Sequence, residues 1–112
     1  PGGDSQPQCN LQVFNNMVDF GMNVQEAVEA PRFCGYSFPQ SPWPHRNYPN
    51  RLEIEGRVSQ ELLDALGDLG HQMDVVDPWG IRNGFAPIIV DIESGVYHGG
   101  ADPRKESVML GW

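Results

Sequence analysis

Two consecutive glycines, Gly2 and Gly3, stand directly before a helix-capping sequence near the start of the 112-residue chain. Glycine has no Cβ, so the backbone N–H groups of such a pair can approach a ligand closely, and a following helix N-terminus adds a positive potential. A pair of this kind can bind a carboxylate, a phosphate or the oxyanion that forms during acyl transfer. The dipeptide on its own is more typical of a plain turn, so its context has to decide between the two interpretations.

Other residue types that carry chemistry do not form a recognisable motif. The histidines at 45, 71 and 98 are far apart, with no Cys, His or carboxylate at the spacing of zinc ligands, so we predict no metal site and no cofactor. The serines lack the G-x-S-x-G elbow, and neither cysteine has a histidine context that indicates a nucleophile. The acidic row of Glu61, Asp64 and Asp68 is typical of a solvated helix face rather than a cation site.

Cys9 and Cys34 are the two cysteines of the chain. Two are too few for a disulfide scaffold, and their spacing is not that of a CxxC redox or metal pair. A disulfide would require a helix position and a distant loop to lie against each other. We therefore predict free thiols.

Two helices are expected to follow the glycine pair. Asp4 and Ser5 are residue types that cap helices, Pro7 suits a first turn, and apolar residues recur at helical spacing, which predicts a helix over residues 5–20. Gly21 ends it, and residues 23–26 form a capping sequence for a second, short helix that ends at Pro31.

The segment from Cys34 to Pro49 belongs to a stretch with five prolines and five aromatic residues. Proline removes backbone donors and disfavours helix in the preceding residue, so residues 31–49 are predicted to form an excursion rather than an element. It could be a proline-rich recognition ligand, but a surface loop pinned by its aromatic side chains is the preferred interpretation.

The second half of the sequence predicts strands around one more helix. Residues 52–55 alternate apolar and acidic, as in a half-buried strand, and Ser59 caps a helix that presents Leu62, Leu63, Leu66 and Leu69 on one face until Gly70. Residues 73–76 form a short strand, and residues 85–92 and 96–98 form a hairpin. Because the first hairpin arm is apolar nearly throughout, we expect it to be covered on both faces.

Composition limits the class of protein. A net charge of −8 makes nucleic acid an improbable partner, and the chain contains neither a membrane-spanning apolar run nor a signal segment. The length fits one segment, residues 1–112, with a modest core. The start at Pro1 and the 13 glycines and 10 prolines favour part of a larger protein over a complete one.

Several motifs together resemble a known family over essentially the whole chain. They are Pro1-Gly2-Gly3-Asp4, Gln8 with the helix at residues 11–22, the segment 26–33, Leu69-Gly70-His71 and the segment 99–104. In this order they resemble the C-terminal part of the small subunit of the γ-glutamyltransferase (γ-glutamyl transpeptidase) family.

The resemblance implies an α+β fold, the C-terminal part of an N-terminal-nucleophile hydrolase αββα sandwich. It implies that Gly2 and Gly3 donate backbone amides to an oxyanion when a threonine nucleophile attacks a γ-glutamyl amide such as glutathione. The implied partners are the remainder of the small subunit, the large subunit and the γ-glutamyl substrate. A periplasmic or cell-surface location follows from the resemblance alone.

The sequence departs from the family pattern in one decisive respect, because it contains no threonine. We therefore expect the segment alone to be inactive, and to self-associate through sheet surfaces that the parent enzyme would cover. Two alternatives remain open: a non-catalytic structural or dimerisation module, and a related acylase of the cephalosporin acylase or poly-γ-glutamate depolymerase type. The segment from Cys34 to Pro49 is longer and richer in proline and aromatic residues than the family pattern.

Overall fold

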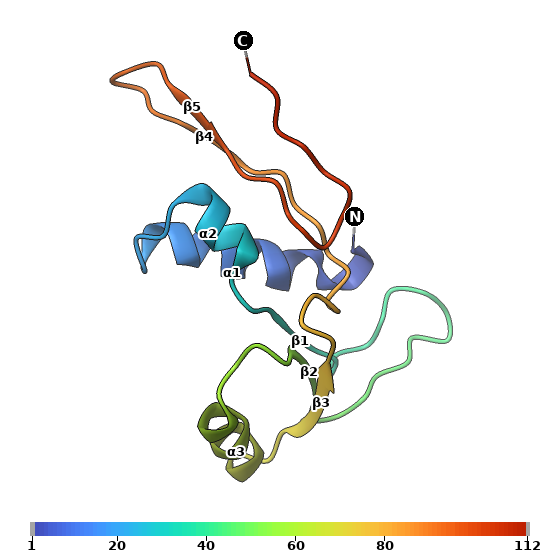
Figure 1. Ribbon diagram of the computed structural model, residues 1–112. Helices are drawn as coiled ribbons and strands as arrows, with labels where there is room; N and C mark the ends of the chain where they lie inside the picture. Colours follow the sequence, from blue (N-terminus) through green and yellow to red (C-terminus); the bar gives the residue numbers. More distant parts are fainter. Residues whose placement is uncertain (1, 112) are drawn as a thin grey trace.

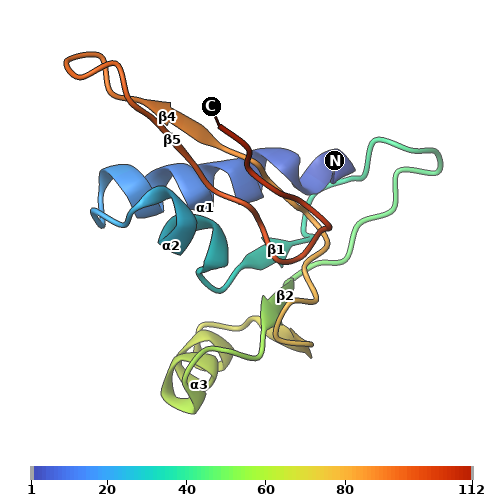
Figure 2. The ribbon, with the colours of Figure 1, turned by 45° about the horizontal axis from the view of Figure 1, so that its top comes forward.

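The structure is a computed structural model, which describes residues 2–111. Its elements in chain order are the 3₁₀ turn η1 (Gly3–Ser5), helices α1 (Gln6–Val18) and α2 (Val24–Glu29), strands β1 (Phe33–Gly35) and β2 (Arg51–Glu55), helix α3 (Gln60–Asp68), and strands β3 (Gln72–Val76), β4 (Ile88–Val90) and β5 (Tyr97–Gly99). In both views α1 and α2 lie between a small sheet that carries α3 and the β4–β5 hairpin (Figures 1 and 2).

The sheet has the order β1-β2-β3. Strands β1 and β2 are antiparallel, with Cys34 opposite Glu53, whereas β2 and β3 are parallel and joined by α3. A parallel pair needs a crossover connection, and the leucine-rich helix supplies it. The separate β4–β5 hairpin is antiparallel, with Ile89 opposite His98.

The turn between the two helices follows the local signals at Gly21 and Asn23, although α1 ends two residues before the predicted position 20 and α2 ends at Glu29. Gly21 adopts a φ of 67°, which is the left-handed conformation expected after a helix. Asn23 accepts hydrogen bonds from the backbone of Gln25 and Glu26, and the Glu26 carboxylate accepts one from the Asn23 N–H in return. This capping box turns the chain so that Ala27 and Val28 pack against α1.

Glutamine side chains of α1 pair with the free edge of β1. The Gln8 amide donates to the Gly35 carbonyl and accepts from the Gly35 N–H, at 3.0 and 2.9 Å. Gln12 makes the same two bonds to Phe33, at 2.9 and 3.1 Å. The helix thus satisfies backbone groups that an edge strand would otherwise leave open, and it fixes the start of α1 relative to the sheet.

Two expectations about the first half of the chain need correction. Residues 33–35 form strand β1 rather than part of an irregular excursion, because β2 supplies their backbone partners. Asp4 and Ser5 do not cap α1 with their side chains: Asp4 accepts hydrogen bonds from Ser41, and the Ser5 hydroxyl donates to the Gly2 carbonyl at 2.7 Å. Pro7 does stand in the first turn of the helix.

The loop after β1 is fixed by fewer aromatic side chains than predicted. Tyr36 packs against the core, and Arg51 lies over its ring at 5.0 Å. Trp43, in contrast, is 86% exposed. Residues 36–50 extend away from the sheet on the same side of the molecule as the start of α1 (Figures 1 and 2), where Asp4 fixes the loop through Ser41.

The second half of the chain is more exposed than the apolar pattern indicates. Ser59 accepts a hydrogen bond from Leu62 N–H as predicted, but no residue of α3 is buried and Leu69 is 78% exposed. Strand β4 is exposed along its whole length, with Ile88 at 57%, so within residues 2–111 nothing covers both of its faces. Gly95 has the positive φ, 73°, expected in the hairpin loop.

Candidate active-site loop and its supporting network

The Gly2–Gly3 loop is a left-handed turn that leads directly into α1. Gly2 has a φ of 136° and Gly3 a φ of 54°, both in the region that favours glycine. Ser5 N–H donates to the Gly2 carbonyl at 3.2 Å, which closes the turn. Among residues 2–111, the backbone N–H groups of Gly2 and Gly3 have no hydrogen-bond acceptor.

Asn83, a buried residue from the link between β3 and β4, holds this loop in place. Its side-chain amide donates to the Ser5 hydroxyl at 2.6 Å and to the Cys9 sulfur at 3.1 Å. A Cβ at Gly2 would lie 2.0 Å from the Asn83 Oδ1, so only glycine fits there, whereas a Cβ at Gly3 would meet no atom within 4 Å. Both glycines are therefore required for their positive φ, and Gly2 is also required because Asn83 leaves no room for a Cβ.

A cleft of about 280 Å³ lies beside the loop. It is lined by the loop itself, by Gln8 of α1, and by residues of β1 and the long loop that follows, among them Gly35, Tyr36, Phe38 and Pro42. The carboxylate of Asp4 forms the link between the two walls, because it accepts hydrogen bonds from the backbone and the hydroxyl of Ser41. These bonds lower the pKa of Asp4 below its ordinary value. The proline-rich loop is thus attached directly to the glycine loop.

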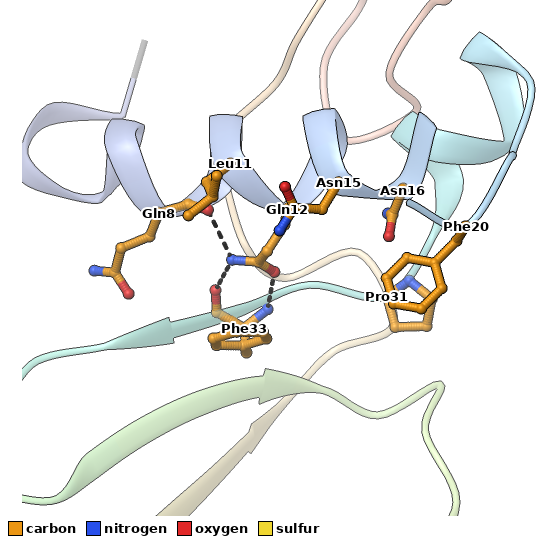
Figure 3. Close-up of a pocket in the computed structure, with 8 residues that line it drawn as sticks. All are labelled: Gln8, Leu11, Gln12, Asn15, Asn16, Phe20, Pro31 and Phe33. Atoms are coloured by element: carbon orange, nitrogen blue, oxygen red, sulfur yellow. Dashed lines mark hydrogen bonds between the residues drawn. The ribbon is translucent and has the colours of Figure 1, made fainter. Parts of the chain in front are cut away.

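A larger groove of about 380 Å³ runs between α1 and the chain before and into β1 (Figure 3). Its lining consists of apolar side chains and amides, with the Gln12 amide bonded to Phe33. The groove contains no titratable side chain, so it offers shape but no acid, base or nucleophile.

Behind the glycine loop lies a buried ion-pair network that joins segments far apart in the sequence. Arg32 pairs with Asp102 at 2.6 Å, Asp102 with Arg104 at 3.0 Å, and Arg104 with Glu55 through two contacts of 2.6 Å. The side chains of Asp102, Arg104 and Glu55 are 0% exposed. Arg57 completes the network by donating to Glu55 at 2.8 Å.

The network also satisfies the backbone around it. Glu55 accepts from the N–H groups of Arg32 and Ile81, and Arg104 donates to the carbonyls of Val28 and Ala30 at the end of α2. Burial alone would raise the pKa of Glu55, but the hydrogen bonds and charge of Arg104 outweigh burial and hold it below its ordinary value.

Arg32 connects this network to the site, because its guanidinium donates to the Asn83 carbonyl. The same guanidinium donates to the Val28 carbonyl at 2.9 Å and lies over the Phe85 ring at 4.6 Å. Asn83 is thus held on its main-chain side by Arg32, while its side chain holds the glycine loop. The position of that loop depends on the fold of the whole segment.

Cys9 and Cys34 are free thiols, as predicted, but the reason given for that prediction is wrong. The helix and the segment that becomes β1 do lie against each other, and the two sulfur atoms are 3.4 Å apart. Both side chains are buried in the cluster with Ile81.

Sequence reasoning identified the glycine loop but missed the residues that position it. Asn83 is almost 80 positions away, in a turn-rich link without any pattern of its own. Arg32 and Arg104 stand in two segments that carry the family resemblance, but no role was predicted for either, because their burial depends on partners in other elements. Among the described residues, no group of His, Cys, Asp or Glu has the arrangement of metal ligands. None of the described helices has the length and apolar character needed to cross a bilayer.

Comparison with known proteins shows the family to which the chain belongs. The family model described as Gamma-glutamyltranspeptidase matches residues 1–112. The chain belongs to the gamma-glutamyltranspeptidase family. It is 49% identical over 122 aligned residues to a glutathione hydrolase proenzyme of Pseudomonas sp. (strain A14), covering 100% of this chain and 19% of that protein. It is 33% identical over 111 residues to the glutathione hydrolase-like YwrD proenzyme of Bacillus subtilis, covering 98% and 20%.

Solved structures agree with this assignment. The structure superposes on a cephalosporin acylase from Bacillus halodurans with a TM-score of 0.82 and 31% identity, covering 99% of this chain and 19% of that one. The fold is α+β, the C-terminal part of an N-terminal-nucleophile hydrolase sandwich, as the resemblance implied. The chain spans about a fifth of the length of the curated relatives it matches.

Proposed function

We propose that this gamma-glutamyltranspeptidase segment contributes the oxyanion-binding loop of a γ-glutamyl acyl transferase or hydrolase that acts on glutathione and related γ-glutamyl amides. In this proposal the backbone N–H groups of Gly2 and Gly3 bind the negative oxygen of the tetrahedral intermediate. The main support is the left-handed loop with two N–H groups unpaired among residues 2–111, held by Asn83. Such preorganised donors stabilise charge as it develops in the transition state.

The nucleophile must come from another part of the parent enzyme, because this sequence contains no threonine. The segment alone is therefore proposed to be inactive. Its exposed apolar side chains, including Leu11 and Phe14 on α1 and Ile88 on β4, are proposed to contact the remainder of the small subunit and the large subunit. Without those partners, the same surfaces would promote self-association.

A related acylase is the second candidate function. The observation in its favour is the similarity to the cephalosporin acylase structure, at 31% identity and near-complete coverage of this chain. The glycine loop would serve the same role with either acyl group, since the oxyanion is common to both reactions. Turnover of glutathione, a glutaryl-cephalosporin and poly-γ-glutamate by the full-length protein would distinguish the substrates.

Substitution of Gly3 by valine tests the role of the loop. Gly3→Val introduces a β-branched residue at a φ of 54°, where the added Cβ would meet no atom within 4 Å, so its main effect is on the backbone conformation of the loop. Gly21→Val is a matched control, because Gly21 has a φ of 67° and equally open surroundings at the far end of α1.

Both variants are made in the full-length enzyme and assayed with γ-glutamyl-p-nitroanilide. Loss of an oxyanion donor lowers kcat by about 100-fold or more, so Gly3→Val should fall by that amount while Gly21→Val keeps most of its activity. Equal activity of the two variants would contradict the proposal.

A further inference from the structure

The two cysteines form a pair that the proposed acyl transfer does not use. Cys9 comes from the first half of α1 and Cys34 from the middle of β1, and their sulfur atoms lie 3.4 Å apart. Both residues are buried, at 0% and 1% exposure, in a cluster that also contains Ile81. The glutamine bonds between α1 and β1 hold the two elements on either side of the pair.

The surroundings of the two thiols differ in a way that favours one of them as a nucleophile. The hydrogen bond with Cys34 lowers the pKa of Cys9 to about 7, although burial opposes this, and the Asn83 amide and the positive charges of Arg32 and Arg104 lower it further. The hydrogen bond with Cys9, together with burial, raises the pKa of Cys34. Of the two adjacent thiols, Cys9 is therefore the one that loses its proton more readily, which favours it as the attacking group.

We propose that Cys9 and Cys34 are a site of oxidative modification at which a small-molecule disulfide, such as oxidised glutathione, converts the two thiols into an intramolecular disulfide. The inference stands on the juxtaposition of two sulfur atoms from elements 25 residues apart. It does not depend on the role of the glycine loop.

The reaction is a pair of thiol–disulfide exchanges. The Cys9 thiolate attacks one sulfur of oxidised glutathione, forms a mixed disulfide and releases one glutathione thiolate. The Cys34 thiol loses its proton to that thiolate and attacks the Cys9 sulfur, which releases the second glutathione. The two cysteine sulfurs together lose two electrons, and one glutathione disulfide is reduced to one glutathione thiol and one glutathione thiolate, which takes up a proton from solvent.

Burial determines when the first step can occur. Both thiols are at 1% exposure or less, and Ile81 and Asn83 of the link after β3 contact the pair. Oxidised glutathione must therefore reach Cys9 while this link is displaced and α1 stays packed on β1. That packing keeps Cys34 against the mixed disulfide and favours expulsion of glutathione over other reactions. The resulting cross-link would join the helix that carries the Gly2–Gly3 loop to the strand that lines the cleft.

Peptide mapping of the full-length protein tests the proposal directly. The protein is incubated with oxidised glutathione, with reduced glutathione as the parallel sample, and free thiols are then alkylated under denaturing conditions. Trypsin cleaves after Arg32 and Arg46, so Cys9 and Cys34 fall in different peptides. In the oxidised sample we expect the peptide ending at Arg32 to be linked to peptide 33–46, and a reducing agent should separate the two.

Two single variants distinguish the mechanism. Cys34→Ser should retain glutathione on Cys9, because the second exchange is impossible, whereas Cys9→Ser should leave Cys34 mostly unmodified. Full alkylation of both cysteines in the oxidised wild-type sample would overturn the proposal. Glutathione retained on both cysteines of the wild type would overturn it as well, since adjacent thiols should expel it.

Discussion

Substitution of Glu55 by glutamine gives a sharp test of the buried network. Glu55 lies at the end of β2, fully buried, and accepts from Arg104, Arg57 and two backbone N–H groups. Glu55→Gln preserves the size of the side chain but removes its charge and one of its acceptor atoms. Arg104, whose side chain is also fully buried, would then pair with Asp102 alone among the charged side chains of residues 2–111.

The size of the effect follows from burial. Removing one member of a buried ion pair costs about 3–5 kcal/mol, because it leaves an uncompensated charge in a low-dielectric interior. Since Asp102 still faces Arg104, we expect the lower end, about 3 kcal/mol. Glu53→Gln is the matched control two residues earlier on the same strand. Its partner Arg51 is 34% exposed, so that pair should contribute about 1 kcal/mol at most.

Hydrogen–deuterium exchange of the full-length protein measures both variants locally. A loss of about 3 kcal/mol should accelerate exchange by about 100-fold in peptides that contain β2 and the start of β1, whereas Glu53→Gln should leave it within about fivefold. Because the pKa of Glu55 is lowered in the folded state, its stabilisation is complete above the unfolded value of about 4.3 and is lost as the pH falls through the lower folded value. The difference between Glu55→Gln and wild type should therefore narrow below about pH 4. Equal exchange in the two variants at neutral pH would refute the argument.

Two further predictions concern the supports of the glycine loop. Asn83→Ala removes the hydrogen bond to the Ser5 hydroxyl, so kcat for γ-glutamyl-p-nitroanilide should fall by about tenfold with little change in KM. An unchanged kcat would show that Asn83 does not position the glycine loop for catalysis. Asp4→Asn weakens the attachment of Ser41, so hydrogen exchange should increase in residues 36–50 but not in β2; unaltered exchange in that loop would show that other contacts hold it.

The sequence predicted those elements whose signals are local. The capping box at Asn23, the left-handed glycine after α1 and the glycine in the hairpin loop each depend on a few adjacent residues. Strand β1 was missed because its three residues stand between prolines and form a strand only through β2, about 20 positions later. The apolar pattern of β4 predicted burial on both faces, but within residues 2–111 the strand remains exposed.

The same difference between local signals and tertiary contacts applies to the candidate site. The glycine pair was visible as a short motif, and family resemblance gave it a role. Its supports were not visible, because Asn83, Arg32 and Arg104 gain their roles from tertiary contacts across 23 to 78 positions. Glu55 shows most clearly what could not be predicted from the sequence. Strand alternation predicts an exposed carboxylate, yet Arg104 makes burial of its charge possible.

The central claim is that Gly2 and Gly3 bind the oxyanion in the parent enzyme. A crystal structure of the full-length protein, trapped with an electrophilic γ-glutamyl analogue that forms a tetrahedral adduct, tests it directly. The account predicts that the oxygen corresponding to the oxyanion lies about 3 Å from the backbone nitrogen of Gly2, Gly3 or both. An oxygen held by other donors, with both glycine N–H groups directed elsewhere, would contradict it.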